Sequence, residues 1–150
     1  SRTIAVDPKS YATIEGYTQT LAHELTHASQ SDGLNPARDG APKPMESFTN
    51  AQSYADHGME MEARAEARAY DLARDRNFPH SSTQQLRDIY DAAVNGATGT
   101  PEERREAGVK AMVDAMRDGS AGASWQTERQ TYVDDYNRRY PVAATSGAVQ

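Results

Sequence analysis

The sequence predicts a mainly α-helical domain with a minor β part at its start. Apolar residues recur at helical spacing in the first part of the chain, and capping and stop signals bracket several later segments. With 150 residues, the chain has the usual length of one domain. We therefore expect a single domain over residues 1–140, followed by a small, polar and disordered tail over 141–150.

The first expected elements are a strand, a helix and a long loop. The run Thr3–Val6 is apolar and partly β-branched, and Asp7-Pro8 stops it, which predicts a short strand. Apolar residues every three or four positions predict a helix over 14–30 with one buried face. That face consists of Ile14, Tyr17, Leu21, Leu25 and Ala28. Glycines and prolines spread over Ser31–Asn50 predict a long loop.

Two helical segments are expected in the middle of the chain. Residues 48–55 fit a short helix, and an alanine-rich helix over Met59–Arg76 follows Gly58 and ends before Pro79. Ser82 and Gln85 have the spacing of a capping box for another helix over 83–95, closed by Gly96.

The last two helices carry clear end signals. Thr100 as N-cap, Pro101 at the first position and Glu103 predict where one begins, and Gly119 predicts where it ends. Ser124 is the expected N-cap of the final helix, and Pro141 ends it. Trp125 on this helix is expected to anchor the core.

The residues from His23 to His27 spell His-Glu-Leu-Thr-His, an HExxH motif inside the first predicted helix. Histidines four residues apart project from one helical face, so both rings can reach one ion. Cysteine is absent, so the other ligands must be His, Asp or Glu, a donor set that suits zinc. Glu24 would lean over the open coordination position and accept a proton from metal-activated water. The alternative is that both histidines are structural and Glu24 forms an ordinary ion pair.

A third ligand has to come from elsewhere, because no further histidine follows His27 at the spacing of the extended motif. The helix over 59–76 offers glutamates. Its charged stripe of Arg64, Arg68, Asp71 and Asp75 must face water, and Glu60 lies close to that stripe.

Glu62 and Glu66 point to the opposite, apolar side of the same helix. Carboxylates there would cost several kcal/mol unless they were paired or coordinated. We favour Glu62 as the zinc ligand, with Glu66 orienting a histidine ring from behind. The reverse assignment stays open, as does an internal ion pair with an arginine of another helix.

The group that would stabilise an oxyanion is not identified by the sequence. His57 and His80 flank the glutamate-bearing helix, and each is more simply interpreted as an exposed loop histidine. Tyrosines are the other donors of the right chemistry, although their spacing is more typical of core packing. These tyrosines are Tyr90, Tyr132, Tyr136 and Tyr140.

The arrangement resembles the gluzincin metallopeptidases, in which an HExxH helix is completed by a glutamate on a second helix, with an acidic or amide residue four positions later. The resemblance rests on His23, Glu24, His27, Glu62 and Glu66, and covers roughly the first half of the chain. It implies a zincin-like fold in which the HExxH helix packs against the glutamate-bearing helix, with Zn²⁺ as cofactor.

The strand–loop–helix lead-in and the alanine-rich helix are also similar to small bacterial toxin or effector zincins. The C-terminal metallopeptidase domains of VgrG-type spike proteins of type VI secretion are of this kind. That likeness implies a secreted or delivered domain, fused to or carried by a spike protein, with the target-cell periplasm as one place of action. We expect no signal peptide within the given sequence.

The expected function is that of a zinc-dependent endopeptidase with a peptide or protein substrate. Two alternatives are a catalytically silent zincin-like binding module and a metal-dependent amidase that cleaves peptidoglycan cross-links. The formal net charge of −6 argues against nucleic acid as a partner, and no apolar run is long enough to predict a membrane span. The paired arginines at 104–105 and 138–139 are expected on solvated helix faces.

Overall fold

The computed structural model describes residues 13–79 and 84–141, and most of them belong to helices. The helices are α1 (Ile14–Asp32), α2 (Pro36–Asp39), the 3₁₀ turn η2 (Met45–Ser47), α3 (Ala51–Asp75), α4 (Gln84–Gly96), α5 (Pro101–Asp118) and α6 (Ala123–Arg139). The mainly α prediction is confirmed, and no strand occurs in these ranges. The expected strand Thr3–Val6, the expected cap Ser82 and residues 142–150 of the expected tail lie outside them.

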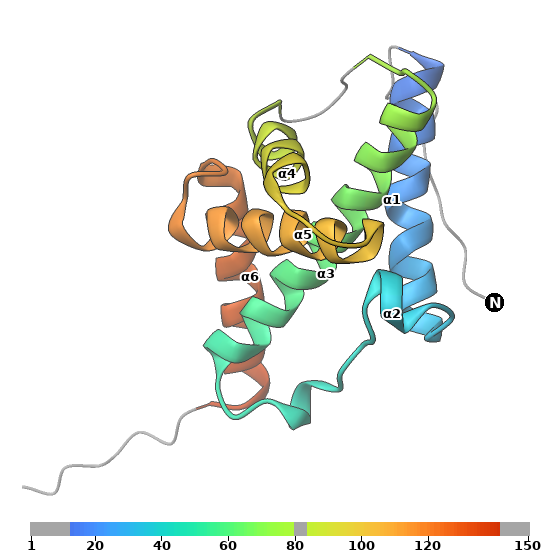
Figure 1. The fold of residues 1–150 in the computed structure, drawn as a ribbon. Coiled ribbons are helices and arrows are strands. Elements are labelled where there is room, and N and C mark those ends of the chain that lie inside the picture. The colour runs from blue at the N-terminus through green and yellow to red at the C-terminus, as the bar shows by residue number, and fades with distance from the viewer. Residues whose placement is uncertain (1–12, 80–83, 142–150) are drawn as a thin grey trace, which may run out of the picture.

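The longest helix, α3, is the centre of the arrangement. In Figure 1, α1 runs beside the C-terminal half of α3, and α6 lies near the N-terminal half of α3. α5 crosses α3 between α1 and α6. α4 packs on α5, and α2 lies against the C-terminal end of α1. None of the helices in the described residues is long and apolar enough to cross a bilayer.

The ends of α5 lie where the sequence placed them. The side chain of Thr100 accepts from the backbone N–H of Glu103 at 3.2 Å, and the Glu103 carboxylate accepts from the Thr100 N–H at 2.8 Å. This reciprocal capping box fixes the first turn. Gly119 ends the helix in the left-handed region, at φ 88°, which favours glycine.

The start of α6 differs from the prediction. The helix begins at Ala123, after Gly122 at φ 109°, so Ser124 lies in the first turn and is not the cap. A turn from Gly119 to Gly122 precedes it, closed by a hydrogen bond from the Gly122 N–H to the Gly119 carbonyl at 3.0 Å. The early start follows from this turn, which brings the chain into the helix before Ser124.

α3 is one uninterrupted helix over Ala51–Asp75, not a short segment followed by a helix from Met59. Asn50 caps it, because its side chain accepts from the Ser53 N–H at 2.9 Å. Gly58 lies inside the helix and is buried. A Cβ at this position would lie 2.8 Å from the ring of Tyr132, so the glycine permits close packing of α6 and is not a break.

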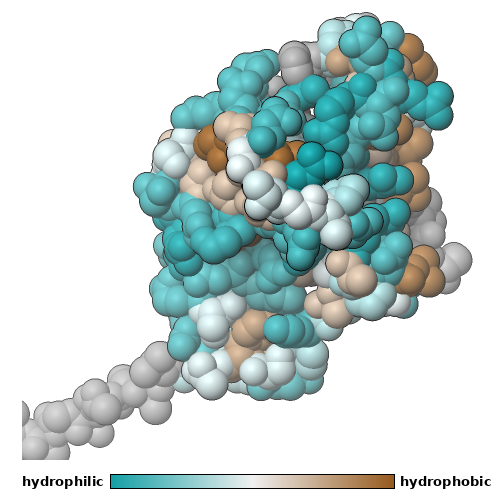
Figure 2. Space-filling view, viewed as in Figure 1, coloured by the Kyte–Doolittle hydropathy of each residue, from teal (hydrophilic) through white to brown (hydrophobic). Residues whose placement is uncertain are grey.

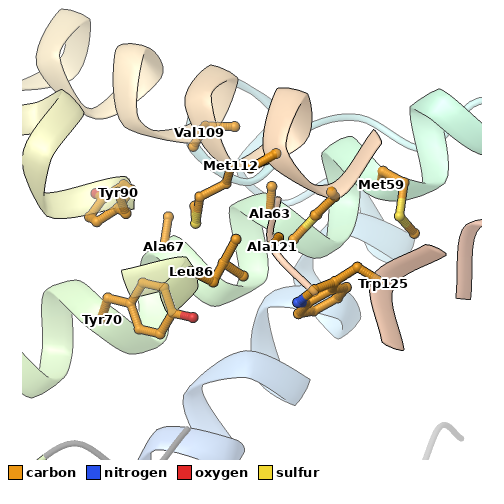
Figure 3. Close-up of a cluster of buried hydrophobic side chains, with 12 residues drawn as sticks. Met59, Ala63, Ala67, Tyr70, Leu86, Tyr90, Val109, Met112, Ala121 and Trp125 are labelled. Carbon is orange, nitrogen blue, oxygen red and sulfur yellow. The ribbon is translucent and has the colours of Figure 1, made fainter. Parts of the chain in front are cut away.

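The hydrophobic core lies on one side of α3, where α4, α5 and the start of α6 cover it (Figure 3). The expected anchor Trp125 belongs to it. Its other members are Met59, Ala63, Ala67, Tyr70, Leu86, Tyr90, Val109, Met112, Ala115, Met116 and Ala121. This core is built mainly from alanine, methionine and aromatic residues and includes no residue of α1.

α1 faces the rest of the molecule with its polar side, so the predicted apolar face is buried only in part: Tyr17, Leu21 and Ala28 are half-buried. Ile14 is 71% exposed and Leu25 is 52% exposed, whereas Gln19, Thr26 and Gln30 are buried. Brown patches along the right edge of Figure 2, where α1 lies, mark this outward apolar surface. The helix is turned this way because its histidine-bearing side meets the glutamates of α3.

The charged stripe of α3 does not face water along its length, contrary to expectation. Arg64 is only 12% exposed and forms a bidentate pair with Glu106 of α5 at 2.7 and 2.8 Å. Asp71 accepts from Tyr90 at 2.9 Å and from Arg105 at 3.2 Å. Much of the stripe is covered because α4 and α5 bring oppositely charged side chains against it. Arg105 was expected on a solvated face and is also mostly buried.

The predicted loop 31–50 contains α2 and η2, and hydrogen bonds to α1 and α5 hold α2 in place. Asp39 is fully buried, where it accepts from the Ser29 hydroxyl at 2.7 Å and from both Nε and Nη2 of Arg38. The carbonyl of Arg38 in turn accepts from Arg105 at 2.8 Å. The end of α1, the α2 turn and α5 are therefore linked by one buried polar network.

Candidate metal centre

Two histidines of α1 and one glutamate of α3 bring their donor atoms together. α1 and α3 run antiparallel, so that His27 faces Glu62 while His23, one turn earlier, reaches both Glu62 and Glu66. The Nε2 atoms of His23 and His27 are 3.0 Å apart. Oε2 of Glu62 lies 3.2 Å from Nε2 of His27 and 3.5 Å from Nε2 of His23.

This triangle has the size that a zinc ion requires. Tetrahedral ligands at zinc bond lengths of about 2.0–2.1 Å are separated by about 3.3 Å. The three separations of 3.0, 3.2 and 3.5 Å bracket that value. His23, His27 and Glu62 are also a group of His and acidic residues that could hold a metal ion in the described part of the chain. Two imidazoles and one carboxylate fit Zn²⁺, with one position left for water or substrate.

Glu66 lies behind the triangle and not in it. Its Oε1 is 3.5 Å from Nδ1 of His23, the nitrogen that faces away from Glu62. Burial raises the pKa of Glu66, partly offset by the nearby His23. The carboxylate can thus orient the His23 ring, as the sequence analysis favoured over the reverse assignment.

Gln30 holds the ring of His27 from behind. The Nε2 amide group of Gln30 donates to the carbonyls of Asp39 at 2.8 Å and Met61 at 2.9 Å. This fixes the orientation of the amide, so its Oε1, 2.8 Å from Nδ1 of His27, must be the acceptor. Nδ1 therefore carries the hydrogen, and Nε2 of the neutral ring presents its lone pair to the other donors.

Tyr132 of α6 contacts the centre from a third helix. Its hydroxyl donates to Oε1 of Glu62 at 3.0 Å, which leaves Oε2 facing the histidines. Burial and the charge of Glu62 raise the pKa of Tyr132, so the phenol stays protonated and keeps donating. The close approach of α6 at Gly58 places this ring.

Without metal, His27 and Glu62 form a half-buried ion pair. Burial by itself would lower the pKa of His27, but the hydrogen bond and charge of Glu62, with help from Gln30 and Glu24, raise it to about 9. Burial would raise the pKa of Glu62, but hydrogen bonds from His23 and His27 lower it to about 2. A cation entering this centre at neutral pH must therefore displace a proton from His27.

Glu24 lies next to the donor atoms without joining them. It is half-buried on α1, and its charge contributes to the raised pKa of His27. Within residues 13–79 and 84–141, no hydrogen bond or ion pair engages its carboxylate. A carboxylate with no partner beside a metal-sized donor set is available to take up a proton.

The structure brings one of the candidate oxyanion donors, Tyr132, to the centre. Tyr90 donates to Asp71 and Tyr136 donates to the Phe48 carbonyl, so both are engaged elsewhere. Tyr140 is partly exposed at the end of α6.

Of the two candidate loop histidines, the structure describes His57, which does not join the donor cluster. His57 lies inside α3, largely buried against Phe48 with Glu60 as its charged neighbour, and is not the exposed loop histidine expected. His80 is outside the described residues.

Two residues of the centre were not identified from the sequence as its supports. Gln30 lies three positions after His27, a helical spacing that predicts contact between the two side chains. The partner of Tyr132 is 70 positions away along the chain, so only the packing of α6 on α3 reveals it. Glu60 lies outside the centre, where it is 41% exposed and pairs with Arg64 at 3.0 Å.

Comparison with family models, with curated proteins and with solved structures finds no match for this chain. The chemistry of the centre therefore has to be argued from its own residues.

Proposed function

We propose that this domain is a zinc-dependent metallopeptidase that hydrolyses peptide bonds of peptide or protein substrates. The observation that carries the proposal is the metal-sized triangle of Nε2 of His23, Nε2 of His27 and Oε2 of Glu62, with the unpartnered Glu24 beside it. The proposal is also supported by the HExxH spacing, because the same helix supplies both histidines and the candidate base.

Each residue has a distinct task in the proposed reaction. His23, His27 and Glu62 would hold Zn²⁺, which when bound polarises a carbonyl and acidifies water. Glu24 takes the proton from the attacking water and later passes it to the leaving amine. Glu66 and Gln30 keep the two imidazole rings in place.

Tyr132 has two roles open to it in this reaction. It orders the Glu62 carboxylate through the 3.0 Å hydrogen bond, and its single hydroxyl hydrogen would have to leave that carboxylate to meet an oxyanion near the centre.

Zinc content and proteolysis test the proposal together. Purified protein should contain about one equivalent of zinc and should cleave an unfolded protein such as casein. A chelator should stop the cleavage, and added Zn²⁺ should restore it. Bound zinc without cleavage would instead point to a silent binding module, whereas cleavage of peptidoglycan cross-links alone would point to an amidase. Protein that folds normally and binds no zinc contradicts the proposal.

The biological setting is proposed on the likeness of the chain's lead-in and alanine-rich helix to small bacterial effector zincins. A bacterial effector zincin, carried by a VgrG-type spike of type VI secretion into a target cell or its periplasm, would need a compact catalytic domain of this size. Toxicity of the chain to bacteria when it is directed to the periplasm, and loss of toxicity in a Glu24→Ala variant, would support this setting. Equal growth with wild-type and variant chains in both cytoplasm and periplasm would contradict it.

A further inference from the structure

A hollow on α6 opens beside the candidate metal centre. It has a volume of about 550 Å³, within the size range of ligand pockets. Tyr132 belongs to both places, because its ring lines the hollow while its hydroxyl donates to Glu62. The remaining lining residues are Tyr54 of α3 and Ser124, Thr127, Glu128, Thr131, Asp135 and Arg138 of α6.

Aromatic rings and hydroxyls make up most of the wall. Tyr54 and Tyr132 stand edge to face, with ring centroids 5.9 Å apart. The tyrosine faces can attract a cation, and the neighbouring hydroxyls can accept hydrogen bonds from it. A wall of this kind suits a long side chain with an apolar stem and a charged head.

Glu128 supplies the charge. It is half-buried, and it forms no hydrogen bond or ion pair with any residue of the described ranges. By contrast, Asp135 at the other end of the hollow is already paired with the exposed Arg138 at 3.1 Å. Glu128 is therefore the acidic group of the hollow that lacks a cation.

The position of Glu128 ties it to the metal centre. It precedes Tyr132 by four residues, so the two side chains lie on the same face of α6, about 5–6 Å apart at Cβ. Burial and the charge of Glu62 raise the pKa of Glu128, and Glu66 adds to this against the opposing His23 and His27. A positive group bound here would relieve repulsion among these carboxylates.

We propose that this hollow binds a lysine or arginine side chain of the substrate, adjoining the peptide bond held at the metal centre. The proposal rests on the proposed peptidase function and names the substrate class of that site. The cationic head would pair with Glu128, while the stem would lie against Tyr54 and Tyr132. The overall acidity of the chain, with a formal net charge of −6, favours approach of such basic substrates.

Cleavage-site mapping is the first test. Zinc-loaded wild-type protein digests unfolded casein, and mass spectrometry identifies the cut bonds; lysine or arginine should be enriched at one fixed position near the cut. A matched pair of peptides is then made around a mapped site, with lysine in one and norleucine in the other. The lysine peptide should have a kcat/KM about 10-fold or more higher, as expected for one charge-assisted hydrogen bond.

Substitutions in α6 test whether the hollow causes this preference. Glu128→Gln should bring the ratio of the two kcat/KM values close to one. Asp134→Asn removes the same charge from an exposed position of α6 and should leave the ratio unchanged. If Glu128→Gln does not fold, Thr131→Lys offers a second route: Thr131 is exposed, and the new ammonium would occupy the hollow and remove the preference.

A binding measurement separates the two proposals. The zinc-loaded Glu24→Ala protein should bind the fluorescent lysine peptide more tightly than the norleucine peptide. If the lysine peptide binds selectively but wild-type protein does not cleave it, the hollow still binds lysine as proposed, and the peptidase function is overturned. Cleavage with no lysine or arginine preference, or the same ratio in Glu128→Gln as in wild type, would overturn the hollow alone. Preference for peptidoglycan fragments over both peptides would overturn it as well.

Discussion

The hydroxyl of Tyr132 donates to Oε1 of Glu62 at 3.0 Å, so that one carboxylate oxygen is engaged by α6 and the other faces the histidines of α1. Three helices that are distant in sequence therefore meet at a single carboxylate. This relationship assigns different roles to the two glutamates of α3, because Glu66 contacts His23 from the side that faces away from Glu62.

Glutamine substitutions should separate those two roles. Glu62→Gln removes a donor of the triangle, so zinc affinity should fall by at least 100-fold. Glu66→Gln keeps a hydrogen-bond acceptor beside His23, so affinity should fall by about 10-fold or less. Titration against a competing chromophoric chelator measures both constants. A larger loss in Glu66→Gln than in Glu62→Gln would reverse the assignment.

Glu24 and His23 should fail in different ways when they are removed. Glu24→Ala should abolish hydrolysis and keep about one equivalent of zinc, because the side chain lies outside the donor triangle. His23→Ala should lose the metal and, with it, the activity. Metal analysis beside a casein assay distinguishes the two variants. Substantial activity in zinc-loaded Glu24→Ala would remove the general-base role.

Gln30 should matter for metal binding without contacting the ion. Gln30→Leu removes the acceptor for Nδ1 of His27 and leaves two carbonyls, those of Asp39 and Met61, without their donor. We expect zinc affinity to fall about 10- to 100-fold, as for other residues that orient a ligand. Nitrogen NMR of the metal-free protein above pH 9, where the His27 ring is neutral, should show loss of the single His27 tautomer. Unchanged affinity and tautomer would contradict the role of Gln30.

Zinc affinity should depend steeply on pH. His27 must lose a proton to bind, and its pKa is about 9 in the metal-free protein, so the apparent affinity should rise up to 10-fold per pH unit until about pH 9. Metal-free stability has the opposite sign. A raised pKa stabilises the fold fully below the ordinary histidine value of 6.5, and this contribution is lost as pH rises through about 9.

Chemical unfolding at several pH values in the presence of a chelator measures the second effect. Glu62→Gln is its control, because the charge that raises the pKa of His27 is removed. Metal-free wild-type protein that is equally stable at pH 6 and pH 9 would show that the pair does not form.

The close contact at Gly58 should be sensitive to one added methyl group. Gly58→Ala places a Cβ 2.8 Å from the ring of Tyr132, so α6 must shift. Overpacking of this kind costs about 1–3 kcal/mol, against a gain in helix propensity below about 1 kcal/mol. Urea unfolding should therefore show a net loss. Gly96→Ala is the control, because a Cβ there meets nothing within 4 Å and should not destabilise the protein.

Local signals predicted helix ends well where capping chemistry decides them. Thr100 and Gly119 bound α5 in the sequence and in the structure because the cap and the left-handed stop depend on neighbouring residues alone. The predicted start of α6 was wrong because the glycine turn before Ser124, and not the side chain of Ser124, sets where the helix begins. Gly58 was misinterpreted as a boundary because its reason, the ring of Tyr132, comes from another helix.

Burial was harder to predict than helicity. Ile14 and Leu25 were expected inside because they share an apolar face, yet both are exposed, whereas Tyr17, Leu21 and Ala28 of that face are half-buried. The pairing of histidines with glutamates decides the orientation of α1, and that pairing was visible in the sequence. Glu62 and Glu66 could be predicted as site residues because they are carboxylates on an apolar helix face. Nothing in the spacing of residues indicated that α5 would cover Arg64.

The orientation of α1 has a consequence for how the molecule comes apart. The helix adds no side chain to the hydrophobic cluster, and within the described residues its polar contacts with the rest of the chain include those of Gln19, His23, His27, Ser29 and Gln30. Subglobal opening of α1 should therefore require less free energy than unfolding of the α3–α4–α5 unit. Amide hydrogens of α1 would exchange before those of α3, α4 and α5. An ion bridging α1 and α3 would slow exchange in α1 more than in these other helices. Binding of the metal would then decide not only the chemistry of the centre but also whether α1 stays packed on α3.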